Sequence, residues 1–374
     1  MDIIYAKKFR IPDNSANMIQ GVNMVAAFNT CGVRTHAHFS VRPGTDPVQY
    51  IRLHYGVESE DAGNAVFAPA SMRGLRYLKW LCSCIIRHDD AIIYTREGVE
   101  AQRAVWLRNL HRPRLKVIHE IHKFDIDIRQ DTPEAARERS RLRKLLSNVS
   151  GAVFIDDILR QVACDILRLE IPTHVAPSGF NPSCIRPCRP PVSQSPIMLG
   201  YFGKVVASKG LDLLVAAFRL LPGMYRLRLV GDATDEIRKM LKGLAGEASE
   251  RLEFTGRVEH AHLAAALDET HLSIIPAVSQ TLYLSPLKLY ESLAMGLPLV
   301  CTPMPHLKKV LTENEHAVFA SSMTPETLAA AIRRLGEDAE MMRRMRDANT
   351  AHSAHFSWNK RAEGIISFIQ HLGR

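Results

Sequence analysis

The residue types that could do chemistry gather in one segment of the second half, SPLKLYESLAMGLP at positions 285–298. Ser and Pro at its start and Gly and Pro at its end predict a short helix with both ends marked. We expect a strand just before it, so that the backbone N–H groups and positive dipole of the helix N-terminus could stabilise a diphosphate. Lys288 and Glu291 share one helix face, and Glu291 could accept hydrogen bonds from a ribose diol. A plain surface Lys–Glu pair is the alternative.

A second segment, GYFGKVVASKGLD at positions 200–212, joins a predicted strand to a predicted helix. Gly203 would let the backbone approach a ligand closely, and Lys204 and Lys209 would neutralise phosphate charge as point cations. The segment is not a P-loop, because the Gly-Lys-Ser/Thr ending is absent. An ordinary solvated loop explains it equally well.

In the first half, a predicted strand at Lys116–Ile121 is followed by His122. The alternation of a strand places Glu120 and His122 on one face and His119 on the other. The end of a strand is where an open parallel sheet binds ligands, which makes His122 a catalytic candidate. A lone histidine is more often structural, and a buried Glu120 would usually pair with a neighbour.

These residues need two sheets to position them. Short β-branched or aromatic runs alternate with helical patterns along the whole chain, which predicts α/β units with parallel sheets covered on both faces. Strands of the first half are expected at Ile3–Tyr5, His36–Val41, Ala91–Thr95, Lys116–Ile121 and Ala152–Ile155. Those of the second half are expected at Ile197–Phe202, Arg226–Val230, Leu252–Thr255, Leu272–Ile275 and Pro298–Cys301. Between the halves, a stretch rich in Pro, Ser and Cys at positions 181–196 predicts an interdomain linker.

Composition narrows the function classes. The 374 residues carry a formal net charge of +9, which favours anionic partners. The seven cysteines form no C-x-x-C pair, and we expect them to be reduced in the cytoplasm. We expect neither a signal peptide nor a membrane span, and no nucleic-acid-binding motif is present.

Taken in order, GYFGKVVASKGLDLLVAAF, LRLVGD, LEFTGRV and SPLKLYESLAMGLPLV resemble the donor half of retaining glycosyltransferases with the GT-B fold, the large family four. NSANMIQGVNMVAAFNTCGV, IIYTR and VIHEIH in the first half resemble the subgroup with a SPLK-type helix. The resemblance implies two Rossmann-like, doubly wound domains facing a cleft. Residues 1–182, joined by a C-terminal helix at 356–374, would form the acceptor domain, and residues 192–355 would form the nucleotide-sugar donor domain.

The resemblance also implies residue roles. Lys209 and Lys204 would bind the donor diphosphate, although the family usually has Arg at the second of these positions. Glu291 would hold the ribose, and His122 would contact the donor sugar near the reacting centre. Tyr283 stands where many members place a Glu that touches the sugar, so backbone N–H groups from Leu284 to Leu287 would replace it. The implied donor site comprises Gly203, Lys204, Lys209, Gly231, Asp232, Arg257, Val258, Tyr283, Leu284, Ser285, Pro286, Leu287, Lys288 and Glu291.

Three further residues, Asn14, Ser15 and Asn17, stand where the family often has a glycine-rich loop near the phosphates. Capping of the helix that follows is the simpler role for them. Glu120 completes the candidates of the first half.

The expected reaction moves a sugar, with retention, from a UDP- or GDP-sugar to a hydroxyl acceptor in cell-surface glycan or glycolipid assembly. No metal or other cofactor is expected, since we recognise no Asp-x-Asp dyad suited to holding a divalent ion. Two basic helices, at Arg73–Arg87 and Glu134–Leu146, could lie on the inner face of a membrane. A nucleotide-sugar epimerase or hydrolase, or a catalytically degenerate nucleotide-binding protein of the same fold, is the alternative.

Overall fold

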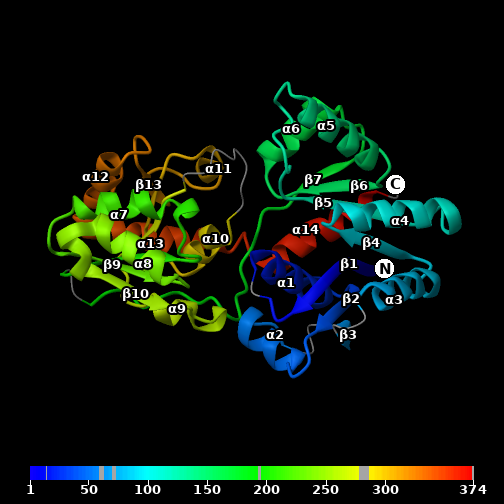
Figure 1. The fold of residues 1–374 in the computed structure, drawn as a ribbon, viewed down its shortest axis with the longest axis horizontal. Coiled ribbons are helices and arrows are strands. Elements are labelled where there is room, and N and C mark those ends of the chain that lie inside the picture. Colours follow the sequence, from blue (N-terminus) through cyan, green and yellow to red (C-terminus); the bar gives the residue numbers. More distant parts are fainter. Residues whose placement is uncertain (14, 59–62, 70–72, 193–194, 278–285, 373–374) are drawn as a thin grey trace. The chain divides into compact units, whose positions relative to one another are not determined.

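The computed structural model describes residues 1–374 except 14, 59–62, 70–72, 193–194, 278–285 and 373–374 (Figure 1). The described chain divides into two α/β units. Unit 1 comprises Met1–Gly179 and the C-terminal segment from Trp358, and unit 2 comprises residues 180–277 and 286–357. The prediction of two doubly wound parallel-sheet units is confirmed.

Unit 1 contains a parallel sheet of seven described strands in the order β3-β2-β1-β4-β5-β6-β7. The strands are β1 (Asp2–Ile11), β2 (Arg34–Val41), β3 (Asn64–Pro69), β4 (Ala91–Thr95), β5 (Lys116–Ile121), β6 (Gly151–Phe154) and β7 (Thr173–Val175). The helices are α1 (Ala16–Thr30), α2 (Pro47–Tyr55), α3 (Arg73–Arg87), α4 (Gly98–His111), α5 (Pro133–Leu146), α6 (Asp157–Leu167) and α14 (Trp358–His371). Strands β4 and β6 are buried along their whole length, as expected for a parallel sheet covered on both faces.

Unit 2 contains a second parallel sheet, of six described strands in the order β10-β9-β8-β11-β12-β13. The strands are β8 (Ile197–Phe202), β9 (Tyr225–Val230), β10 (Leu252–Gly256), β11 (Leu272–Ile275), β12 (Leu299–Cys301) and β13 (Ala317–Phe319). The α-helices are α7 (Leu211–Arg219), α8 (Asp235–Ala245), α9 (Leu263–Ala266), α10 (Leu287–Ala294), α11 (Pro305–Lys308), α12 (Pro325–Gly336) and α13 (Ala339–Ser353). Short 3-10 turns are η2 (Ala207–Lys209), η3 (Gly246–Arg251) and η4 (His260–His262).

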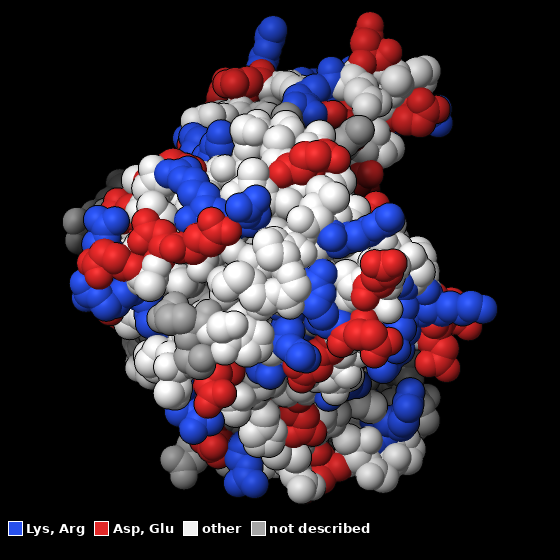
Figure 2. Space-filling view, turned by 90° about the vertical axis from the view of Figure 1, so that its left-hand side faces the viewer, with Lys and Arg blue, Asp and Glu red and all other residues white. Residues whose placement is uncertain are grey.

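Two surface properties bear on possible partners. Among the described residues, the helices fall short of the length and apolar character that crossing a bilayer requires. On the face drawn in Figure 2, acidic and basic side chains are interspersed. The positive charge is therefore not gathered there into a single basic patch.

The segment expected to be a linker, residues 181–196, makes specific contacts within unit 2. Cys188 donates its backbone N–H to the carbonyl of Met295 at 2.9 Å, and Arg186 and Arg189 each reach Asp268 at 2.9 Å. Ile185 and Cys188 are buried in a core cluster of unit 2. Composition alone does not show that arginines and apolar residues of such a stretch find partners in unit 2.

The carboxyl ends of β8, β9 and β10 are held together through glycines. Gly203 donates its N–H to Val230 at 2.9 Å, and Gly231 donates to Gly256 at 2.9 Å. Gly231 has φ +153°, and a Cβ added there would lie only 1.9 Å from the carbonyl oxygen of Gly203. Only glycine therefore lets these strand ends approach so closely.

We expect Gly231→Ala to lower the free energy of unfolding by at least about 2 kcal/mol, because its methyl group cannot coexist with the Gly203 carbonyl. Urea unfolding followed by circular dichroism measures the change. Gly223→Ala is the matched control, since a Cβ at Gly223 would meet no atom within 4 Å. Equal stability of the two variants would contradict the proposed packing constraint.

Candidate functional site

Lys288, the second residue of α10, lies beside the end of β8. Its Nζ is 3.6 Å from the centroid of the Tyr201 ring and 5.8 Å from that of Phe202. A Cβ added at Gly203 would lie 3.6 Å from the Lys288 Cε and Nζ, so the ammonium rests against a bare stretch of backbone. Burial lowers the pKa of Lys288 to about 7, and the positive charge of Lys209 adds to the effect. A bound anion would stabilise this cation.

Lys204 and Lys209 lie on the loop that leads from β8 to α7. Both side chains are exposed, and the Tyr201 hydroxyl donates to the Lys204 carbonyl at 3.0 Å, which holds the loop backbone. Lys209 ends η2 and is followed by Gly210 at φ +74°, the N-cap of α7. The loop therefore presents an exposed cation from Lys209 next to the more enclosed Lys288.

Glu291 is buried on α10 with 6% of its surface exposed. Its Oε1 lies 2.7 Å from Nε2 of His260, the first residue of η4. Burial lowers the pKa of His260, but the Glu291 charge and hydrogen bonds outweigh it and raise the pKa to about 10. The pair is therefore an imidazolium and a carboxylate at neutral pH. The alternative of a surface pair between Lys288 and Glu291 is wrong, because their side chains contact a tyrosine ring and a histidine instead.

His260 is a residue that sequence reasoning missed. It lies three positions after Arg257 in the chain, close to the segment predicted to contact a base. Its pairing with Glu291 joins residues 31 positions apart, which no local spacing reveals.

The ends of α10 only partly match their prediction. The helix begins at Leu287 with Pro286 as N-cap, so Pro286 is not its first helical residue. At the other end Gly296 follows the C-cap with φ +65°, as a terminating glycine should. Tyr283, Leu284 and Ser285 lie outside the described residues.

The remaining donor-site candidates lie at the ends of β9 and β10. Asp232 is exposed, and its carbonyl accepts from the Val205 N–H at 3.1 Å, so its backbone has a clear structural role. Arg257 is exposed, and Val258 packs against a buried apolar cluster. Gly203 and Gly231 form the close contact described above. The structure thus places the described candidates of unit 2 near the carboxyl ends of the strands of its sheet.

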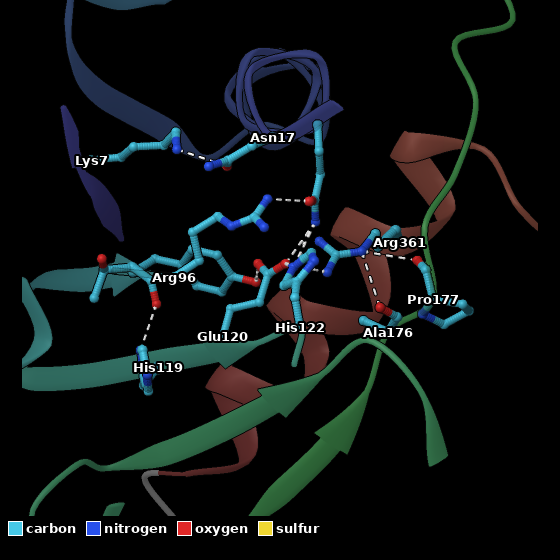
Figure 3. Close-up of polar contacts among 12 residues, drawn as sticks. Lys7, Asn17, Arg96, His119, Glu120, His122, Ala176, Pro177 and Arg361 are labelled. Carbon is cyan, nitrogen blue, oxygen red and sulfur yellow. Dashed lines mark hydrogen bonds and ion pairs between the residues drawn. The ribbon is translucent and has the colours of Figure 1, made fainter. Parts of the chain in front are cut away.

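In unit 1, the carboxylate of Glu120 is surrounded by donors (Figure 3). Gln20 donates to it at 2.7 Å and Arg361 of α14 at 2.8 Å. The Tyr94 hydroxyl and His122 Nε2 also contact it. Burial raises the pKa of Glu120, but the Arg361 charge and the hydrogen bond from His122 hold the pKa well below its usual value. Glu120 is therefore a buried anion at the end of β5.

Burial sets the protonation state of His122, and the Glu120 carboxylate sets its tautomer. Burial lowers the pKa of His122 to about 4 against the opposing charge of Glu120, so the ring is neutral at pH 7. A carboxylate can only accept, so His122 donates from Nε2 and Nδ1 keeps its lone pair. Glu120 and His122 lie together as predicted, while His119 contacts the Thr95 carbonyl through Nδ1 at 3.1 Å. The neutral His122 could accept a proton or a hydroxyl hydrogen bond at Nδ1.

The loop before α1 is mainly a cap. Ser15 accepts from the Met18 N–H as the N-cap of α1. Asn17 accepts from the buried Lys7 at 2.8 Å, and Lys7 also pairs with Glu97 at 3.1 Å. Asn14 lies outside the described residues. These contacts give Ser15 and Asn17 structural roles, and they do not test a role near phosphates.

Comparison with known proteins adds to this geometry. Residues 196–338 match the family model "Glycosyl transferases group 1". Unit 2 therefore contains a segment similar to this glycosyltransferase family. The chain is also similar to the D-inositol 3-phosphate glycosyltransferase of Segniliparus rotundus, with 29% identity over 184 residues. That match covers 46% of this chain and only 39% of the relative's own length.

Solved structures extend the likeness in fold to both units. Sucrose-phosphate synthase from Thermosynechococcus elongatus has a TM-score of 0.75 at 16% identity, covering 100% of this chain and 99% of its own. Anabaena HepE in complex with UDP has a TM-score of 0.74 at 13% identity, covering 99% of this chain and 100% of its own. The GT-B fold expected from the sequence is therefore confirmed.

We expect Arg361→Met to destabilise the protein by about 3–5 kcal/mol, because it leaves the Glu120 carboxylate buried without its main counter-ion. Urea unfolding measures the loss. Adding Glu120→Gln to this variant should recover part of it, since the unpaired charge is then gone.

Lys360→Met is the control for this helix, because Lys360 pairs with Glu363 at 2.8 Å on the exposed face of α14. Its stability should stay close to that of the parent protein. If Arg361→Met unfolds at the same urea concentration as Lys360→Met, the buried pair does not hold α14 in unit 1.

Proposed function

We propose that the protein is a retaining glycosyltransferase that moves a sugar from a nucleoside-diphosphate sugar to a hydroxyl acceptor. The observation that carries the proposal is that α10 bears two side chains suited to the two polar parts of a nucleoside diphosphate. Lys288 offers a cation for a diphosphate, and Glu291 offers carboxylate oxygens for a ribose diol. The family match over residues 196–338 supports the same assignment.

Uracil is the donor base that we propose to test first, with uridine nucleotides as ligands. HepE, which shares the fold, has been captured with UDP, with UDP and glucose, and with UDP-glucose. A GDP-sugar is the alternative donor. The exposed Arg257 and the neighbouring Val258 are the candidates for contact with the base.

The chemistry would centre on the leaving group. As the bond from the anomeric carbon to the diphosphate breaks, Lys209 and Lys288 would stabilise the negative charge that develops on the phosphate oxygens. The departing phosphate would take the proton of the acceptor hydroxyl, so the reaction as proposed needs no metal ion. His122, neutral and with Nδ1 available, would accept a hydrogen bond from a sugar hydroxyl. We place the acceptor in cell-surface glycan or glycolipid assembly, with the basic helices α3 and α5 as candidates for peripheral membrane contact.

Glu291→Gln and Lys209→Ala should each abolish or strongly reduce the thermal stabilisation by UDP or GDP. A nucleotide at a hundredfold excess over its dissociation constant stabilises the folded protein by about 2.7 kcal/mol. Thermal unfolding with and without each nucleotide, in the absence of metal, measures the response. Lys242→Ala on α8 is the matched control, because Lys242 is an exposed lysine of the same unit.

Product analysis separates the proposal from its alternatives. With a UDP- or GDP-sugar and a mixture of hydroxyl acceptors, the proposal requires a new glycoside with the donor's anomeric configuration. Release of free sugar alone, or interconversion of nucleotide sugars, would assign the hydrolase or epimerase alternative. Binding without turnover would assign the degenerate one.

Lys288→Met should raise the melting temperature of the empty protein while removing its response to nucleotide. The pKa of Lys288 is about 7 in the folded protein and 10.5 when unperturbed. Between these values the unfolded chain binds a proton that the folded chain lacks, so Lys288 makes stability rise with pH. Below about pH 7 both states are protonated, and the cost of burying the charge is fully present. Differential scanning calorimetry from pH 6 to 9 measures the slope.

The exposed Lys209 gives the control, because Lys209→Met should leave the melting temperature of the empty protein nearly unchanged. A fall in the melting temperature of Lys288→Met would show that the contact with Tyr201 outweighs the cost of burial. It would also contradict the inference that the buried charge of Lys288 needs an anion to stabilise it.

A further inference from the structure

Three side chains with metal-binding atoms converge in unit 1 away from the residues discussed so far. Asp2 Oδ2 lies 3.3 Å from His36 Nε2 and 2.8 Å from His88 Nδ1. The two imidazole rings lie 4.3 Å apart between centroids. Among the described residues, this is the only group of three His, Cys, Asp or Glu side chains whose ligand atoms all lie within 4.8 Å of one another.

The cluster has the dimensions of a metal site. Zinc binds imidazole nitrogen and carboxylate oxygen at about 2.0–2.2 Å, so tetrahedral ligand atoms lie about 3.3 Å from one another. The distance between Asp2 and His36 matches this value, and the distance between Asp2 and His88 is about 0.5 Å shorter. Two histidines and one carboxylate, with a further position open to water, are a recurrent zinc ligand set.

The sheet holds the ligands in place. Asp2 is the first residue of β1, and it pairs with Arg34 of β2 on one side and Ala91 of β4 on the other. His36 is the third residue of β2, and His88 lies in the turn before β4, where its carbonyl accepts from Ala91 N–H at 3.2 Å. The site therefore lies at the amino ends of three neighbouring strands. Glu120 and His122, in contrast, lie at the carboxyl end of β5.

We propose that Asp2, His36 and His88 form a binding site for a divalent transition-metal ion, with zinc as the ion that their chemistry matches best. The ion would link β2, β1 and β4 at their amino ends and stabilise unit 1. It would take no part in sugar transfer, so the proposal stands apart from the proposed function.

The competing explanation is that the cluster is only a set of hydrogen bonds and ion pairs. One feature favours this explanation, and another favours an ion. Arg34 Nη1 lies 3.8 Å from the same Asp2 oxygen, and 63% of its side chain is exposed. A metal ion would have to displace this guanidinium towards solvent. The side chains of Asp2 and His88 are 16% and 24% exposed, which leaves the oxygen and the imidazole accessible to an ion.

The test uses the full chain with a removable C-terminal tag that contains no histidines, because an N-terminal extension would lie next to Asp2. After treatment with chelator, the protein is titrated with zinc chloride by calorimetry, and with magnesium chloride as a hard-ion control. We expect one equivalent of zinc to bind and to raise the melting temperature, with no response to magnesium. Asp2→Asn and His88→Gln should each raise the dissociation constant for zinc by at least about tenfold.

His371→Gln is the matched control, since His371 is an exposed histidine of α14 in the same unit and should leave the affinity unchanged. Cobalt chloride gives a readout on the unaltered protein, because bound cobalt with nitrogen ligands in a low-coordinate site absorbs strongly in the visible range. Absence of zinc binding would overturn the proposal. So would zinc binding that survives both substitutions, or a cobalt spectrum identical to that of the hydrated ion.

Discussion

A carboxylate that is removed from water needs donors on every side, and this requirement at Glu120 determines which segments of unit 1 lie together. Gln20 comes from α1, Tyr94 from β4 and Arg361 from α14, so the last helix of the chain supplies the main counter-ion of a residue 241 positions earlier. A buried ion pair adds little net stability, but losing one partner is costly, and the contact therefore makes α14 an obligatory part of unit 1. Burial keeps His122 neutral, and the hydrogen bond to the same carboxylate leaves the lone pair of the ring on Nδ1.

In unit 2, the environment of Lys288 is the opposite of that of Glu120. In the described part of the chain, the Lys288 ammonium has an aromatic face rather than a carboxylate within ion-pair distance. Its lowered pKa shows that the ring does not replace the water that burial removes. Lys209 adds a second positive charge instead of relieving the first. Such an arrangement costs stability in the empty protein, and it is useful only where an anion arrives to complete it.

Much of the fold follows from local patterns, whereas the polar partners do not. Buried strands such as β4 and β11 are short apolar runs, and alternation along β5 suffices to place Glu120 and His122 on one face. The edge strands β3, β7 and β13 were missed. β7 and β13 have only three residues each, and β3 is largely exposed, so it does not form an apolar run. The spacing of Lys288 and Glu291 shows that they share a helix face. It cannot show that Tyr201 and His260, from other elements, contact them first.

The pairing of His260 with Glu291 bears on how a ribose would be held. The imidazolium contacts Oε1 alone, and a carboxylate has a second oxygen with its own lone pairs. If a diol hydroxyl displaced His260 from Oε1, the imidazolium would lose its partner and leave its own charge buried, at considerable cost. If the diol used Oε2 and shared Oε1 with His260, the imidazolium would instead orient the carboxylate oxygens for the two hydroxyls. The second arrangement loses no existing contact, so His260 is best understood as the residue that positions Glu291.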